Sequence, residues 1–261
     1  MSVRFEVMPF GRALDEAAQL PEPVRLTVTC SPKHGPDESV GIGTQLRALG
    51  HSVTIHLAAR MVRSPGHLDE LLGQMAGAGI DDAFVIGGDA TSPFGPYSSA
   101  VDLLPLVREH PQRPRTLGIA GYPEGHPLID DDELRRSFAA KAALADYVTT
   151  QLCFDPDAIL RWADGVELPV IVGLPGLVDP RRLLEISVRV GVGPSLRYLR
   201  KQRGLRNLLR LSAASADRLY DALAPHVDAF HLYTFNRLLD TWNWLQTKST
   251  TIQSEPKEVT T

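Results

Sequence analysis

The feature that most constrains the fold is a regular alternation of short β-rich runs with longer helical patterns along the 261-residue chain. Eight runs are short, rich in β-branched or aromatic residues, and bounded by Gly, Pro or polar residues, as strands are. The predicted strands are Val3–Val7, Arg25–Cys30, Ser52–Leu57, Ala83–Gly87, Thr116–Ala120, Tyr147–Leu152, Val170–Leu174 and Ala229–Tyr233. Several are almost continuously apolar, which is typical of parallel strands covered on both faces. This order predicts a single α/β domain, a (β/α)8 TIM barrel, over residues 1–245.

The main alternative is an open, doubly wound sheet. That fold usually has a Gly-rich phosphate loop after its first strand. Here the first predicted strand leads into Met8-Pro9-Phe10-Gly11, which is no such loop. The sequence therefore favours the barrel.

Helical signals fill the stretches between the predicted strands. One amphipathic stripe has i, i+3, i+4, i+7 spacing; it consists of Leu68, Leu71, Leu72 and Met75. Asp155 followed by Pro156 is typical of an N-cap and the first helical position. The stretch 181–224 is longer than one crossover, so we expect extra helices between strands seven and eight. Residues 246–261 are polar and Thr-rich, and we expect them to form a disordered tail.

Composition narrows the classes of partner. Lys and Arg total 27 against 31 Asp and Glu, which gives a net charge of −4. Such a chain has no global attraction to nucleic acid or to an anionic membrane. No secretory signal or membrane-spanning run is evident. The two cysteines, Cys30 and Cys153, form no CxxC pair, so we expect packed thiols, no metal site and a cytoplasmic location. The sequence indicates no obligate protein partner.

Polar residues gather at the ends of the predicted strands, where a (β/α)8 barrel carries its chemistry. Glu6 lies within the apolar first strand, and Asp89 follows the fourth. Burying a carboxylate is costly unless it has a partner or a task. Other residues at these strand ends are Thr29, His56, Gly88, Tyr122, Glu124, His126, Gln151, Tyr233 and Arg237. Convergence from nearly every strand on one rim predicts a binding site.

Purely structural interpretations remain open for these residues. Glu6 could belong to a buried ion pair. His56 and His231 could be core histidines with satisfied hydrogen bonds. Asp89 could cap the helix that follows it. Farther along, the basic segment 197–210 could be the solvated face of outer helices or a docking patch for an anionic tail.

Five segments, in this order, resemble the methylenetetrahydrofolate reductase family. They are FEVMPF (5–10), VIGGDA (85–90), AGYPEGHP (120–127), TTQLCFD (149–155) and FHLYTFNR (230–237). The likeness extends from about Val3 to Arg237, and its specificity comes from the combination of segments. The resemblance implies a (β/α)8 barrel that reduces methylenetetrahydrofolate to methyltetrahydrofolate in one-carbon metabolism and methionine biosynthesis. The family usually uses a reduced nicotinamide and a bound FAD.

The resemblance also implies roles for individual residues. Glu6 matches the general acid that helps open the one-carbon bridge, Asp89 the carboxylate beside the pterin, and Gln151 an amide that contacts the folate. Further substrate-binding candidates are Tyr122, Glu124, Tyr233 and Arg237. The cofactor-binding candidates are Thr29, His56, Gly88, His126 and Lys141. The spacing from Lys141 to Gln151 differs by one residue from that of the family lysine that reaches the FAD phosphates.

Departures from the family pattern concentrate in the flavin-binding positions. Gly87 stands where the family usually has Arg, and 135–140 lacks the usual Asn and Arg contacts to FAD. In this the chain resembles compact actinobacterial members regarded as working without flavin. We therefore expect direct hydride transfer from NADH, with NADPH as the alternative donor. The other interpretations are a conventional FAD-dependent reductase and a non-catalytic folate-binding accessory protein.

Overall fold

The computed structural model describes residues 1–126, 129–177 and 213–254 of the chain. Its strands are β1 (Ser2–Val7), β2 (Arg25–Val28), β3 (Ser52–Ala58), β4 (Asp82–Ile86), β5 (Thr116–Gly121), β6 (Tyr147–Thr150), β7 (Val170–Pro175) and β8 (Ala229–Tyr233). The helices within the described ranges are α1 (Ala13–Ala17), α2 (Pro36–Ala48), α3 (Pro65–Gly77), α4 (Ala100–Glu109), α5 (Asp131–Ala142), α6 (Pro156–Asp164), α9 (Ala213–Leu223) and α10 (Leu238–Ser254), with a 3-10 turn, η1, at Ala59–Met61.

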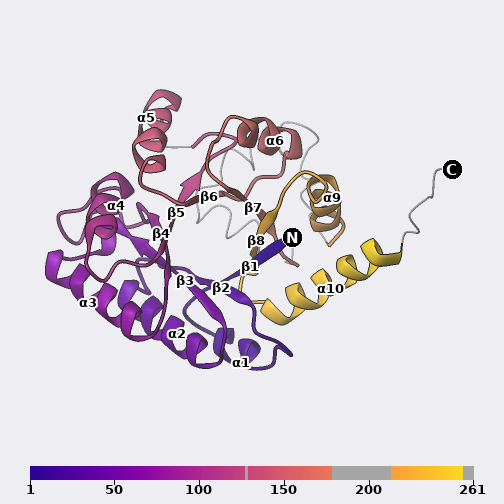
Figure 1. Ribbon diagram of the computed structural model, residues 1–261, viewed down its shortest axis with the longest axis horizontal. Helices are drawn as coiled ribbons and strands as arrows, with labels where there is room; N and C mark the ends of the chain where they lie inside the picture. The colour runs from indigo at the N-terminus through magenta and orange to yellow at the C-terminus, as the bar shows by residue number, and fades with distance from the viewer. Residues whose placement is uncertain (127–128, 178–212, 255–261) are drawn as a thin grey trace.

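The eight strands form one closed barrel in sequence order, and helices surround it (Figure 1). Every neighbouring pair is parallel, and β8 pairs with β1 to close the sheet. Closure leaves no sheet edge, so the predicted TIM barrel is confirmed and the open doubly wound sheet is wrong.

The predicted strand limits are close to the observed ones, with small differences at the ends. β2 ends before Cys30 and β6 before Leu152. β4 ends at Ile86, before the predicted end at Gly87, because the Gly87 carbonyl accepts a hydrogen bond from the Arg60 N–H instead of from a strand. The chain leaves the sheet early where its backbone groups find partners in the βα loops.

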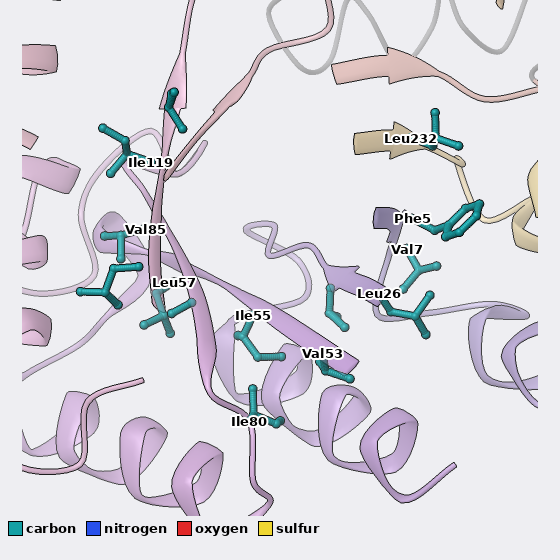
Figure 2. Close-up of a cluster of buried hydrophobic side chains, with 14 of the residues drawn as sticks. Phe5, Val7, Leu26, Val53, Ile55, Leu57, Ile80, Val85, Ile119 and Leu232 are labelled. Atoms are coloured by element: carbon teal, nitrogen blue, oxygen red, sulfur yellow. The ribbon is translucent and has the colours of Figure 1, made fainter. Parts of the chain in front are cut away.

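Most of the apolar core lies between the barrel and its helices. Figure 2 shows strand side chains such as Phe5, Leu26 and Ile55 in this buried layer. These three side chains are 2% exposed or less. Ile55 packs against Gly43 of α2. Alternate residues of a strand point to opposite faces, so the remaining side chains of these strands point into the barrel.

The barrel interior contains a polar layer near the amino ends of the strands. Arg4 of β1 pairs with Asp82 of β4 at 2.9 Å, across the barrel. The Asp82 carboxylate also accepts hydrogen bonds from Thr54 (2.8 Å) and from the Tyr147 hydroxyl (3.0 Å). The Arg4 guanidinium lies 4.2 Å from the centre of the Tyr147 ring. Buried charges are tolerated when they are paired and hydrogen-bonded, so this layer closes the bottom of the site above it.

The sequence signals for the helices agree with the structure where it is described. The predicted stripe of α3 is buried, and the Asp155 side chain caps α6 by accepting from the Ala158 N–H. In the stretch 181–224, α9 is described, and residues 178–212, which include the basic segment 197–210, lie outside the described residues. In the described ranges, no helix combines the length and apolarity that a membrane span needs.

The predicted start of the C-terminal tail is wrong. The predicted tail begins at residue 246, whereas α10 continues to Ser254. The helix is held along α9, because Lys248 pairs with Asp217 at 2.7 Å and with Asp221 at 3.0 Å. Its other end is held by Glu16 of α1, whose carboxylate accepts from the Leu239 N–H. Residues 255–261 of the predicted tail lie outside the described residues.

Candidate functional site

Glu6 lies near the carboxyl end of β1, between two histidines from other strands. Its Oε2 atom is 3.1 Å from Nε2 of His231 on β8 and 3.9 Å from Nε2 of His56 on β3. The Glu6 side chain is 16% exposed, and the two imidazoles are nearly buried. The shorter distance is a hydrogen bond and the longer one is not. Glu6 is therefore a largely desolvated carboxylate with one imidazole partner and limited access to the solvent.

His56 is a buried imidazole that is kept neutral. Burial lowers its pKa from 6.5 to about 4; nearby Glu6 opposes this shift, and His231 adds to it. Its Nε2 atom is buried and has no hydrogen-bond partner. Its ring lies 4.9 Å from the Phe84 ring. The site thus holds a polar nitrogen 3.9 Å from the Glu6 carboxylate without adding a positive charge.

Tyr233 links β8 to the end of β6. Its hydroxyl donates to the Thr150 carbonyl at 3.1 Å, and its ring meets the His231 ring edge-on at 4.8 Å. Burial raises its pKa well above the usual 10, and the charges of Glu6 and Tyr122 act in the same direction. Tyr233 is therefore a neutral hydroxyl at neutral pH.

The loop after β8 is fastened to the loop after β1 by Asn236. The Met8 N–H donates to the Asn236 side-chain oxygen at 2.7 Å, and the Asn236 amide donates to the Phe10 carbonyl at 2.7 Å. Asn236 has a φ of 58°, a conformation that Asn tolerates better than most residues. These bonds hold the strand that carries His231 next to the one that carries Glu6.

Asp89 is presented by a tight turn after β4. Gly88 has a φ of +88°, and a Cβ there would lie 2.9 Å from the Ala58 Cβ, so glycine is needed. Asp89 reaches the solvent at the barrel mouth. The protein around it nevertheless raises its pKa by desolvation, and His126 opposes that shift.

Tyr122, His126 and Lys141 form the side of the site next to Asp89. The Tyr122 and His126 rings meet edge-on at 5.0 Å. The pKa of Tyr122 is raised by burial and then by Asp89, and that of His126 is lowered by burial, with Asp89 opposing and Lys141 adding to the shift. Lys141 is buried near the end of α5, and desolvation lowers its pKa from 10.5 to about 8. Asp89 thus acts on both Tyr122 and His126, and Lys141 acts on His126.

The structure gives local contacts for the other predicted site residues. Gln151 follows Thr150 at the end of β6, and its N–H donates to the Gly121 carbonyl. Thr29 follows β2, with its N–H donating to the Val7 carbonyl. Glu124 lies beside the buried Cys153, whose pKa is raised by burial first and by Glu124 next. Arg237 is exposed, and its guanidinium pairs with Asp240 in the first turn of α10 at 2.8 Å.

The cysteines are packed thiols, as predicted. Cys30 lies with its sulfur 3.4 Å from the Met61 sulfur, and burial raises its pKa to about 12. Cys153 is also free and buried. Neither is poised as a thiolate nucleophile.

His231 is a functional candidate that the sequence leaves open, since a histidine on the eighth strand can also be a core residue. Its contact with Glu6 comes from the pairing of β8 with β1. In that register Glu6 lies opposite Tyr233. The available signal was the period of two: His231 and Tyr233 point to the same face of β8.

Comparison with known proteins now adds to this geometry. The family model described as methylenetetrahydrofolate reductase matches residues 15–177. The chain belongs to the methylenetetrahydrofolate reductase family. The matched part covers most of the chain and includes Asp89, Tyr122, His126, Lys141 and Gln151.

Curated relatives agree with this family. Methylenetetrahydrofolate reductase 1 of Schizosaccharomyces pombe is 33% identical over 85 residues, which are 30% of this chain and 14% of that protein. Methylenetetrahydrofolate reductase 2 of Saccharomyces cerevisiae is 24% identical over 149 residues, 51% of this chain and 25% of that protein. The chain thus matches a quarter or less of the length of these relatives.

Solved structures support the fold alone. Orotidine 5'-monophosphate decarboxylase from Sulfolobus solfataricus has a TM-score of 0.51 and 10% identity, and the match covers 97% of this chain and 98% of that one. A putative lyase/mutase from Burkholderia cenocepacia has a TM-score of 0.50 and 18% identity, with 97% and 83% covered. At such identities the likeness concerns the barrel and says nothing of chemistry.

Proposed function

We propose that this member of the methylenetetrahydrofolate reductase family reduces 5,10-methylenetetrahydrofolate to 5-methyltetrahydrofolate with hydride from a reduced nicotinamide, NADH in the first place. The observation that carries the proposal is the Glu6 carboxylate, held in the barrel mouth 3.1 Å from His231. The reaction needs an acid at a place that water reaches only sparingly, and Glu6 is such a group. Family membership supports the substrate class.

The first step is opening of the ring that contains the methylene bridge. Protonated Glu6 donates its proton to N10, the bond between N10 and the methylene carbon breaks, and an N5 iminium cation forms. Glu6 is left as a carboxylate that accepts a hydrogen bond from His231 Nε2. His231 is the neighbouring group that we propose to pass a proton back to Glu6 before the next turnover.

The cation that forms must be stabilised and not repelled. His56 is neutral because burial lowers its pKa to about 4, so no second positive charge faces the iminium from β3. Asp89 at the mouth supplies a negative charge from the loop after β4. A carboxylate held near a developing cation lowers the energy of that cation.

Hydride transfer completes the reaction. The hydride leaves C4 of the dihydronicotinamide and adds to the methylene carbon, giving the methyl group and the oxidised nicotinamide. The nicotinamide face must lie against the exposed carbon, and the Tyr122 and Tyr233 rings are the candidates to stack with it. Lys141, a buried cation beside His126, is the candidate to hold a phosphate of the dinucleotide.

The residues described here fit FAD poorly. Gly87 adds no side chain at the end of β4. Arg135 and Arg136 of α5 are exposed and pair with Asp132 and Glu133 of their own helix. A pyrophosphate group usually meets several cationic or N–H donors. We therefore propose direct transfer from the nicotinamide and derive no step through FAD.

The test is NADH oxidation by extensively desalted protein, with and without methylenetetrahydrofolate, and with FAD added last. Folate-dependent oxidation before FAD is added is the expected result. Activity that begins only after FAD is added would assign the conventional flavin mechanism. Silence under both conditions, with NADPH also tried, combined with folate binding seen by titration calorimetry, would assign a binding protein.

A further inference from the structure

Arg60 connects the end of β3 to the loop that carries Asp89. It lies in η1, immediately after β3. Its N–H donates to the Gly87 carbonyl at 2.9 Å, and its own carbonyl accepts from the Phe94 N–H at 2.8 Å. Its guanidinium donates to the Thr91 carbonyl at 2.9 Å. These three bonds reach the loop before and after Asp89.

The two segments are also packed closely against each other. A Cβ on Gly95 would lie 2.4 Å from the carbonyl oxygens of Val62 and Arg63, closer than any real contact. A Cβ on Gly88 would lie 2.9 Å from the Ala58 Cβ, which is also too close. The Asp89 loop is therefore seated on the backbone that surrounds Arg60, and a shift of one segment moves the other.

We infer that Arg60 is a positioning residue, which holds the loop after β4 so that Asp89 faces the cation formed in the reaction. The inference rests on the proposed function. It adds a residue outside the predicted site, and it gives Arg60 no contact with the substrate.

The side chain, and not only the backbone, carries this role. The bonds to Gly87 and Phe94 are made by backbone atoms and would survive a substitution. The bond to Thr91, two residues after Asp89, needs the guanidinium. The Arg60 Nε atom is buried and has no hydrogen-bond partner, which costs free energy. The bond from the guanidinium to Thr91 is the contact that offsets this cost.

The kinetic test compares Arg60→Ala, Arg60→Lys and the control Arg63→Ala. Arg63 lies on the same segment, but its guanidinium pairs with Asp37 of α2. We expect Arg60→Ala to lower kcat about tenfold or more with the KM for NADH unchanged, because only the placement of Asp89 is disturbed. Arg60→Lys should restore part of the loss, since its ammonium also donates to Thr91. Arg63→Ala should leave kcat within about twofold of the wild type.

A double-mutant cycle separates positioning from a general structural effect. If Arg60 acts through Asp89, then Arg60→Ala causes little further loss of kcat in an Asp89→Asn background. Full additivity overturns the inference. So does a raised KM for NADH at unchanged kcat, which would mean that Arg60 contacts the dinucleotide itself.

A second readout does not depend on turnover. Hydrogen exchange should be faster in residues 87–96 of Arg60→Ala than in the wild type, and unchanged there in Arg63→Ala. If the wild type has no reductase activity but the two variants show these exchange differences, the proposed function is refuted and the contact between Arg60 and the loop is retained. Unchanged exchange in Arg60→Ala overturns the inference whatever the activity.

Discussion

His231 Nε2 lies 3.1 Å from Glu6 Oε2, although His231 is opposite Arg4, and not Glu6, in the β1–β8 register. The two side chains meet because both point into the barrel, where neighbouring strands bring inward residues of different rows together. The contact joins the proposed acid to a buried imidazole. This contact is the centre of the first two predictions.

Replacing Glu6 by Gln should abolish turnover and spare the binding of folate. The amide has nearly the same shape but has no proton of suitable acidity to donate. General acid catalysis contributes about 10²–10⁴-fold, so a loss of kcat in this range is expected. Steady-state NADH oxidation and calorimetric titration with folate measure the two effects. The same change at exposed Glu109 is the control, and a Glu6→Gln protein with normal kcat would remove Glu6 from the mechanism.

Replacing His231 should impair the return of the proton more than it impairs binding. His231→Ala removes the donor to Glu6, and a kcat about tenfold lower with a nearly unchanged KM for folate is expected. His231→Gln retains an N–H donor and should recover part of the rate, with an altered pH profile. Rates measured across pH for both variants check this. Equal kcat values for His231→Ala and the wild type would limit His231 to a structural role.

His56 should make the fold sensitive to acid. Its pKa is about 4 in the folded chain against 6.5 for the ordinary group, so the unfolded chain binds more protons between these values. Stability is therefore fully present above the ordinary pKa and is lost as the pH falls towards 4. Between about pH 7 and about pH 5 the loss is about 2 kcal/mol.

Urea unfolding at these two pH values measures this difference. His56→Gln should flatten the dependence, whereas His226→Gln, at an exposed histidine, should retain it. A wild type and a His56→Gln variant with the same slope would contradict the lowered pKa.

We expect Lys141 to lower the stability of the fold and to contribute to the binding of NADH. Its pKa is lowered to about 8 by burial, so between this value and 10.5 the unfolded chain holds the proton and the folded chain does not. Stability thus rises as the pH rises through this window, and at neutral pH the buried charge is a net cost. Lys141→Met should be more stable at neutral pH by about 1–3 kcal/mol and should lose that rise.

The same variant should bind NADH more weakly, because it has lost the cation proposed for a phosphate. Thermal unfolding across pH and fluorescence titration with NADH measure the two effects. Lys33→Met, at an exposed lysine, is the control. A Lys141→Met protein that is both less stable and equally good at binding NADH would refute this assignment.

The sequence predicted the architecture well and the arrangement of the site less well. Period-two patterns and their helical spacers predicted the eight strands, because burial on both faces restricts which residues fit. The tail was predicted wrongly at residue 246, because the contacts that extend α10 come from Asp217 and Asp221 on another helix. A polar segment has the same sequence pattern whether its side chains are solvated or form ion pairs with another helix.

Within the site, the resemblance selected residues one by one, and the barrel decided which of them meet. Glu6, His56 and Tyr233 come together because β1, β3 and β8 direct side chains into one interior. Arg237 belongs to a specific motif, and the structure pairs its guanidinium with Asp240 of α10.

The sequence by itself determined the fold class, the family and the residue types available at the carboxyl ends of the strands, since periodicity and local motifs are short-range properties. Only the tertiary structure decided that His231 contacts Glu6, that burial keeps His56 neutral and that Arg60 holds the Asp89 loop. Each of these depends on groups far apart in the chain, and only the folded barrel brings them together.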